Sequence, residues 1–268
     1  MRKAAAFLLL LSVPLSLCAY ELNKSVHIRF GMPSKNGAIF NKSGFILLHS
    51  NKKKVPLWVS YRLEKEDLEN PVKLMRDYRP EPKLKKGRRA ELSDYKKRGM
   101  YDRARMVPLK DMLRDEKLMK QAQYLSNVCP MHNKLNRKRW RELENKVRGF
   151  VKNKSTAWVM AGPVFKDTNN DGKKDNFGML GKNKVWIPTN FFKIIVYQAK
   201  DYSFHAIAFM FINREQKKPL SEYVVAIDEI EKHTGFNFLH LLPDQVEKIM
   251  ETKIPKKEEI DYFLNCDK

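Results

Sequence analysis

Side chains that can hold a phosphate and a divalent metal ion are concentrated between Asp102 and Glu144. The stretch opens on Asp102-Arg103-Ala104-Arg105, continues through Ser126-Asn127 and His132, and ends on Asn136 and Glu144. Arginine forks match phosphate oxygens, and an amide oxygen completed by water can bind a hard cation. Taken alone, the spacing favours a plainer interpretation, a surface turn followed by a helix that asparagine caps.

The charge of the chain points to a polyanionic partner. Lysine and arginine number 53 against 31 acidic residues, which gives a formal net charge of +22. A field of this sign attracts nucleic acid, anionic membrane or acidic glycan, and charge alone does not choose among them. A surface adapted for solubility is nearly as good an interpretation. One basic run close to the chemical stretch, Lys83–Arg89 with Lys96-Lys97-Arg98, is expected to follow a phosphate backbone.

The first 19 residues are typical of a signal peptide. Arg2 and Lys3 precede an apolar stretch over 4–17, and Ala19 is a small residue at the expected cleavage site. The apolar stretch is short for a membrane span, and lipidation at Cys18 is the second interpretation. No later segment is apolar for the roughly 18 residues that a span requires. We therefore expect an exported protein, periplasmic or extracellular, with no membrane span.

Residues 20–268 are expected to form one α+β domain. Short apolar runs at 45–48, 57–61, 157–165, 185–188, 191–197 and 204–212 predict strands, and helices are predicted over 111–125, 137–153 and 221–233, with another near Pro243-Asp244. No repeat or long linker divides the chain. Cys129 and Cys266 could pair in an oxidising compartment, but their wide separation is weak support for a bridge. The sequence identifies neither an inhibitor partner nor an oligomeric state.

The chemical stretch resembles the signature of the DNA/RNA non-specific endonuclease family, which includes the secreted Serratia-type nuclease and mitochondrial endonuclease G. That signature is Asp-Arg-Gly-His, then Ser-Asn-x-x-Pro-Gln, then an Asn ahead of a helix with Trp and Glu. The counterparts here are Asp102-Arg103-Ala104-Arg105, Ser126-Asn127-Val128-Cys129-Pro130-Met131, Leu135-Asn136, Trp140 and Glu144. Further ordered matches are Leu57–Arg62, Arg76, Tyr78 with Glu81-Pro82, Asp94-Tyr95, Ala161–Phe165, Val185–Lys193 and Asp228–Gly235. The resemblance covers residues 40–250 and is specific because the matches are many and in order.

The resemblance implies a ββα-metal (His-Me finger-like) nuclease fold, with a central antiparallel sheet flanked by helices. It further implies hydrolysis of DNA and RNA with little sequence specificity, leaving 5′-phosphates. Asn136 would hold one hydrated Mg²⁺, or Mn²⁺, and Glu144 would orient the metal-bound waters. Asn127 would position the site, Arg103 and Arg76 would clamp phosphate, and Asp102 would orient the loop.

The chain departs from the signature at the position of the catalytic base, where the family has histidine and this sequence has Arg105. A guanidinium cannot accept a proton at physiological pH, although it can bind phosphate. Loss of a general base typically costs on the order of 10²–10⁴ in rate. Three interpretations stay open: His132 serves as a substitute base, solvent hydroxide attacks with metal assistance, or the protein binds nucleic acid or other polyanions without efficient cleavage. An exposed loop histidine without a role is the preferred interpretation of His132.

A second metal motif is weaker. Asp167–Asp175 resembles the start of a Ca²⁺ loop, but Gly178 stands where a bidentate Glu is expected. Because the segment lies between two predicted strands, an Asn-Asp-Gly turn is the preferred interpretation.

Overall fold

A computed structural model describes residues 25–169, 171–199 and 201–266 of the chain. The predicted signal peptide over residues 1–19 lies outside the described residues. Within these, a seven-stranded sheet has the order β1-β2-β3-β6-β9-β10-β11, and every neighbouring pair is antiparallel. Its strands are β1 (Ala38–Asn41), β2 (Ile46–Ser50), β3 (Val55–Leu63), β6 (Ala157–Val164), β9 (Asn190–Gln198), β10 (Phe204–Ile212) and β11 (Val224–Val225). The predicted class, α+β with a central antiparallel sheet flanked by helices, is confirmed.

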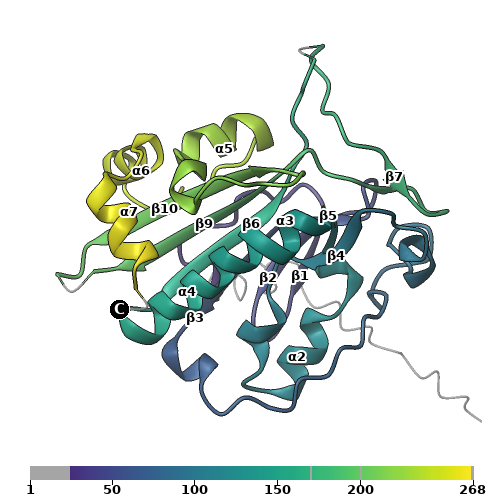
Figure 1. Ribbon diagram of the computed structural model, residues 1–268, viewed down its shortest axis with the longest axis horizontal. Helices are drawn as coiled ribbons and strands as arrows, with labels where there is room; N and C mark the ends of the chain where they lie inside the picture. The colour runs from purple at the N-terminus through teal and green to yellow at the C-terminus, as the bar shows by residue number, and fades with distance from the viewer. Residues whose placement is uncertain (1–24, 170, 200, 267–268) are drawn as a thin grey trace, which may run out of the picture.

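The central strands are apolar on both sides because each face of the sheet is covered. All residues of β6 and all but the last of β9 are buried. On one face, Val159 and Ile195 pack in a cluster with Leu143 and Val147 of the helix α4 (Arg141–Asn153). On the other face, the alternate residues of these strands pack against α5 (Ile227–Thr234). Figure 1 shows α4 crossing in front of the sheet, with α5 and α6 (Asp244–Thr252) at the top of the view and α7 (Lys257–Leu264) below α6.

Two smaller strand pairs stand outside the main sheet. β4 (Tyr101–Arg105) pairs with β5 (Val128–His132), and β7 (Met179–Leu180) pairs with β8 (Val185–Trp186). The β5 strand leads directly into α3 (Asn133–Leu135), the π-helical turn η6 (Asn136–Trp140) and α4. The two strands and the following helix thus form one ββα unit that contains the whole chemical stretch.

Two predicted helices are shorter in the structure. In place of the single helix predicted over 111–125, the structure has the 3-10 turn η4 (Leu109–Met112) followed by the helix α2 (Glu116–Ala122). The second helix starts anew because the Asp115 carboxylate caps it, accepting from the backbone N–H groups of Lys117 and Leu118. The helix predicted over 221–233 begins only at Ile227. Its first residues form η7 (Leu220–Tyr223), and the next two pair with β10 as β11.

The remaining 3-10 turns are η1 (Val26–Ile28), η2 (Lys65–Leu68), η3 (Leu92–Tyr95) and η5 (Leu125–Asn127). Cys129 and Cys266 are both buried and are not bonded to one another. The Cys129 thiol lies 4.0 Å from the carbonyl of Pro56, and the Cys266 thiol donates to the carbonyl of Lys146. None of the helices within the described residues is long and apolar enough to cross a membrane.

Candidate active site

The β4–β5 pair presents arginine side chains outward. Arg105 pairs with Val128 and Tyr101 with His132, and along β4 the residues alternate between half-buried and buried. Arg103 and Arg105 are both half-buried members of this alternation, whereas Ala104 between them is 1% exposed. Because side chains alternate across a strand, the two guanidinium groups share one face.

Asn127 holds the end of β4 in place from inside the protein. Its side chain is fully buried, accepts from the backbone N–H of Val107 at 2.9 Å, and donates to the carbonyls of Val107 and Ala122. All three bonds are to backbone groups, so Asn127 fixes the loop that follows Arg105. The adjacent Ser126 is tied down as well, since its hydroxyl donates to the buried carboxylate of Glu81 at 2.7 Å.

Asn136 begins the helical part of the ββα unit, and its amide is oriented by Asp102. The Nδ2 group of Asn136 donates to the Asp102 carboxylate at 3.1 Å, which leaves the amide oxygen for another partner. Arg137 binds the same carboxylate through two hydrogen bonds of 2.8 and 2.9 Å. Burial opposes the ionisation of Asp102, but these hydrogen bonds outweigh it and lower the pKa.

The π turn brings Asn136 and Glu144 closer to one face. In a regular α-helix, residues eight apart overshoot two turns by about 80°. The wider i→i+5 spacing of η6 takes up part of this rotation, so that both side chains line the same cavity. The sequence pattern did not indicate the π turn.

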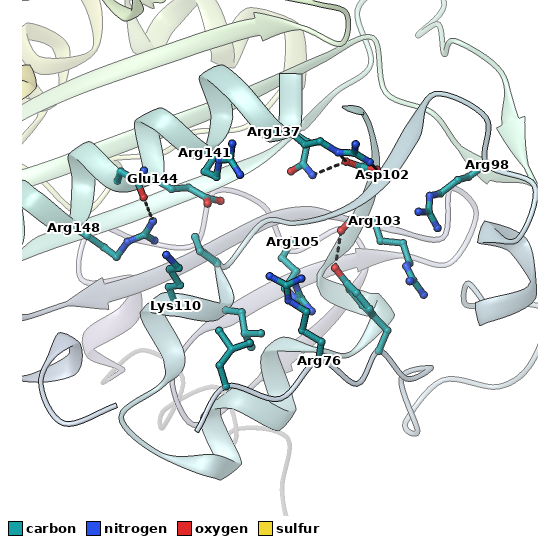
Figure 2. Close-up of a pocket in the computed structure, with 16 residues that line it drawn as sticks. Arg76, Arg98, Asp102, Arg103, Arg105, Lys110, Arg137, Arg141, Glu144 and Arg148 are labelled. Atoms are coloured by element: carbon teal, nitrogen blue, oxygen red, sulfur yellow. Dashed lines mark hydrogen bonds and ion pairs between the residues drawn. The ribbon is translucent and has the colours of Figure 1, made fainter. Parts of the chain in front are cut away.

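One cavity of about 560 Å³ unites the predicted residues. Asn136, Glu144, Arg76, Arg103 and Arg105 all line it, in an open groove between β4 and α4. Of its sixteen lining residues, eight are arginine or lysine and two are acidic. The cations are Arg76, Arg98, Arg103, Arg105, Lys110, Arg137, Arg141 and Arg148. Figure 2 shows Arg76 and Arg105 on the side of the groove opposite Glu144 and Arg141.

Most of these cations have no acidic partner among the described residues. Only Arg137 and Arg148 are in ion pairs, with Asp102 and Asp111. The guanidinium groups of Arg103 and Arg105 instead lie over the ring of Tyr78, at 4.3 and 4.0 Å from its centroid. Burial lowers the pKa of Arg105, and the neighbouring Arg76 and Arg103 lower it further, although a guanidinium stays protonated. The groove therefore has uncompensated positive charge on preorganised, planar donors.

Glu144 forms the acidic wall of the groove. Burial raises its pKa, while the nearby cations Lys193 and Arg148 act in the opposite direction. Lys193 is completely buried on β9, and its ammonium lies 4.5 Å from the ring centroid of Trp140. Burial lowers the pKa of Lys193, whereas Glu144 acts to raise it, and the Lys193 ammonium in turn favours the ionised form of Glu144.

Two candidates do not line the groove: Asn127, which is buried beneath it, and His132. His132 lies at the far end of β5, opposite Tyr101, where its Nδ1 accepts from the backbone N–H of Lys134 and caps α3. It lines a separate cavity with Phe177 and Arg214. The groove lining contains no imidazole.

Several groove residues were missed by the sequence analysis, namely Lys110, Arg137, Arg141 and Arg148. A signal for the last three was present, because they follow Asn136 on the helix at spacings that share a face with Asn136 or Glu144. From the basic run, Arg98 reaches the groove. Arg89 has a structural role instead, since it binds Glu91 and the carbonyls of Glu81 and Leu84.

The described part of the Asp167–Asp175 segment is a turn. The Asp167 carboxylate accepts from the backbone N–H groups of Asp171 and Gly172, and Asp175 accepts from that of Thr168. Such bonds are typical of aspartate-stabilised turns. Binding of Ca²⁺ here stays a prediction.

The chain is similar to known nucleases. A family model described as DNA/RNA non-specific endonuclease matches residues 23–245. Nuclease EXOG, mitochondrial, from Danio rerio is 30% identical over 225 residues, which are 81% of this chain and 65% of that protein, so the chain spans less than two thirds of this relative. Nuclease C1 from Cunninghamella echinulata var. echinulata is 28% identical over 82% of this chain and 90% of its own length.

Two further similarities concern endonuclease G. The human mitochondrial protein is 27% identical over 79% of this chain and 72% of its own length. A solved structure, "Crystal structure of the EndoG/EndoGI complex: Mechanism of EndoG inhibition", superposes with a TM-score of 0.75 at 25% identity, covering 81% of this chain and 91% of that one. The fold and the groove define a ββα nuclease architecture. The chain belongs to the DNA/RNA non-specific endonuclease family.

Proposed function

We propose that this protein is an exported, metal-dependent endonuclease that hydrolyses phosphodiester bonds of DNA and RNA with little sequence specificity. The observation that carries the proposal is the groove, where unpaired arginines surround the Asn136 amide and the Glu144 carboxylate. Guanidinium groups bind phosphate oxygens, which every nucleotide has, and such contacts carry no sequence information.

The residues of the groove suit a hydrated Mg²⁺ or Mn²⁺. Because Asp102 accepts the Asn136 amide N–H, the amide oxygen is turned away from Asp102 and is available to the cation. Glu144 would orient the water ligands, and Mg²⁺ characteristically keeps several of these. When bound, the ion would neutralise negative charge on the leaving 3′ oxygen, and the products would then carry 5′-phosphates.

The chain's own arginines would hold and polarise the scissile phosphate. Arg76, Arg103 and Arg105 all line the groove. Arg76 and Arg103 would clamp the non-bridging oxygens, and Arg105 would stabilise the charge that develops there during attack. We infer that Arg105 occupies the position of the family's base histidine. Since it cannot take a proton from water, the nucleophile would be hydroxide from solvent, and the reaction would be slow at neutral pH and faster as pH rises.

A second function, binding without efficient cleavage, is favoured by one observation. No imidazole lines the groove, and His132 lies in another cavity. The arginines would still bind polyanions in this case, because phosphate binding needs no proton transfer.

A plasmid-nicking assay with purified protein separates the two functions. Cleavage is expected with Mg²⁺ and not with chelator, and Asn136→Ala should abolish it while leaving DNA binding largely intact. Arg103→Ala should weaken both binding and cleavage, and His132→Ala serves as a control outside the groove. Salt-sensitive binding with no Mg²⁺-dependent nicking would establish the binding function, and nicking that survives Asn136→Ala would refute the proposed metal site.

Export rests on the sequence of residues 1–19. Expression of the full chain in a bacterial host, followed by N-terminal sequencing of the extracytoplasmic protein, should give a mature chain that begins at Tyr20. A product that stays in the cytoplasm with residues 1–19 attached would contradict this.

A further inference from the structure

A second cavity, of about 420 Å³, lies at the other end of β4 and is not used by the proposed reaction. It is lined by Met100, Tyr101, His132, Phe177, Asn213 and Arg214. Three of these six residues are aromatic rings, and one is an arginine. This composition differs from that of the groove, where cations predominate.

The rings and the guanidinium that line the cavity lie close to one another. The rings of Tyr101 and His132 are perpendicular neighbours, 6.4 Å between centroids with an interplanar angle of 86°. The guanidinium of Arg214 lies 5.1 Å from the ring centroid of Phe177. Arg214 is exposed, and its guanidinium forms no hydrogen bond or ion pair with the described residues. An exposed planar cation without a partner beside aromatic rings is a surface on which another π-system can stack.

The wall of this cavity is rigid because Asn213 ties three segments together. Its side chain is 1% exposed, accepts from the backbone N–H of His132 at 2.7 Å, and donates to the carbonyls of Pro130 and Pro188. The residue that follows it, Arg214, is therefore held at a fixed place relative to β5. A preorganised surface loses little entropy on binding.

The two cavities are neighbours along one strand. Tyr101 of the second cavity and Arg103 of the groove are two residues apart on β4, so their side chains leave the same face about 7 Å apart. A nucleotide strand whose phosphate lay against Arg103 could place an adjacent base at Tyr101.

We propose that this cavity is a stacking subsite for one unpaired nucleobase, adjacent to the scissile phosphate. This inference rests on the proposed function, since the groove must hold the phosphate. The base would stack on the planes of Phe177 and Arg214, with the rings of Tyr101 and His132 at its side. Because a base inside a duplex is already stacked on its neighbours, the subsite favours single-stranded DNA and RNA, or strands with an unpaired base. Base stacking of this kind changes affinity by about 5- to 160-fold per base.

The test compares two ligands in the presence of chelator, so that no cleavage occurs. One is a fluorescent single-stranded oligothymidylate, and the other is an abasic strand of the same length and charge. The full protein should bind the oligothymidylate more tightly. Phe177→Ala and Arg214→Lys should remove most of this preference, with little change for the abasic strand, since lysine keeps the charge of arginine but not its plane. Tyr202→Ala, at a ring that is 81% exposed elsewhere, is the matched control.

The outcomes distinguish failure of the subsite from failure of the proposed function. The full protein could bind the two strands with equal affinity, and Arg103→Ala could bind neither. This result would overturn the stacking subsite but would still support phosphate binding in the groove. If Arg103→Ala binds both strands as tightly as the full protein does, the proposal that the groove holds the phosphate is wrong. The subsite proposal, which depends on it, then loses its basis. Arg214 is exposed, so Arg214→Lys is expected to fold even if Phe177→Ala does not, and an unchanged base preference in Arg214→Lys would also overturn the proposal.

Discussion

Restoring a general base at position 105 is the most direct test of the proposed active site. Arg105 is half-buried at the end of β4 and lines the same groove as Asn136 and Glu144. Arg105→His would supply an imidazole where the proposed chemistry lacks a proton acceptor. A positioned general base contributes about 10²–10⁴-fold, which corresponds to roughly 3–5 kcal/mol in the activation free energy.

The same substitution removes one phosphate donor. A hydrogen bond to a charged group contributes about 1.5–3 kcal/mol, or roughly 10- to 150-fold in binding, although Arg76 and Arg103 remain. The gain should therefore appear in kcat, with a higher KM. Burial and the two remaining arginines should lower the pKa of the introduced imidazole below its usual 6.5, so most of it would be unprotonated at pH 7.

The assay is the initial rate of supercoiled-plasmid nicking with Mg²⁺ between pH 5 and 9. For Arg105→His, kcat should rise with pH and level off above the imidazole pKa, whereas the unmodified protein should become faster across the whole range. Arg105→Gln removes the charge without supplying a base and is the control. If Arg105→His is as slow as Arg105→Gln, or if its gain persists after Asn136→Ala is added, the proposed geometry of the groove is wrong.

Three further predictions follow from buried polar groups. Asn127→Ala should lower the free energy of unfolding by about 3 kcal/mol or more in urea titration, because it removes three buried hydrogen bonds to backbone groups. A change under 1 kcal/mol would contradict the positioning role. Asp102→Ala frees the Asn136 amide to rotate, so the Mg²⁺ concentration for half-maximal nicking should rise about 10- to 100-fold, and an unchanged value would argue against orientation by Asp102. Glu251 on α6 has its pKa raised to about 8 by burial and by the nearby Glu231, so its carboxyl is protonated in the folded protein and ionised in the unfolded chain between about pH 4.5 and 8. The free energy of unfolding should consequently fall by about 1.4 kcal/mol per pH unit across this window as pH rises. Urea unfolding at pH 5, 6.5 and 8 measures this dependence, and Glu251→Gln should flatten it. Equal slopes for the two proteins would contradict the raised pKa of Glu251.

The sequence was sufficient for the class of fold and for most of the groove. Apolar runs predicted the main strands because strands buried on both faces need apolar residues throughout, as β6 and β9 have. Asn136, Glu144, Arg76, Arg103 and Arg105 were named from motif order and are brought together around one cavity. Helix boundaries were less predictable, since the residues after Pro219 could continue a helix but pair with β10 instead.

Other features depended on contacts between segments far apart in the chain. His132 and Asn136 are four residues apart, yet they line different cavities, because one ends β5 and the other begins the π turn. Lys193 lies within a strand of apolar residues, and its place behind Glu144 comes from the packing of β9 against α4.

What the sequence determined by itself was the set of reactive groups, since residue types and their order along the chain fix which donors, acceptors and charges are available. Which of those groups face the same space was decided only by the tertiary structure. A strand pair and a helix fix direction as well as distance, so Arg103 lines the same groove as Asn136 while His132, on the partner strand, is held about a full strand length from Arg105.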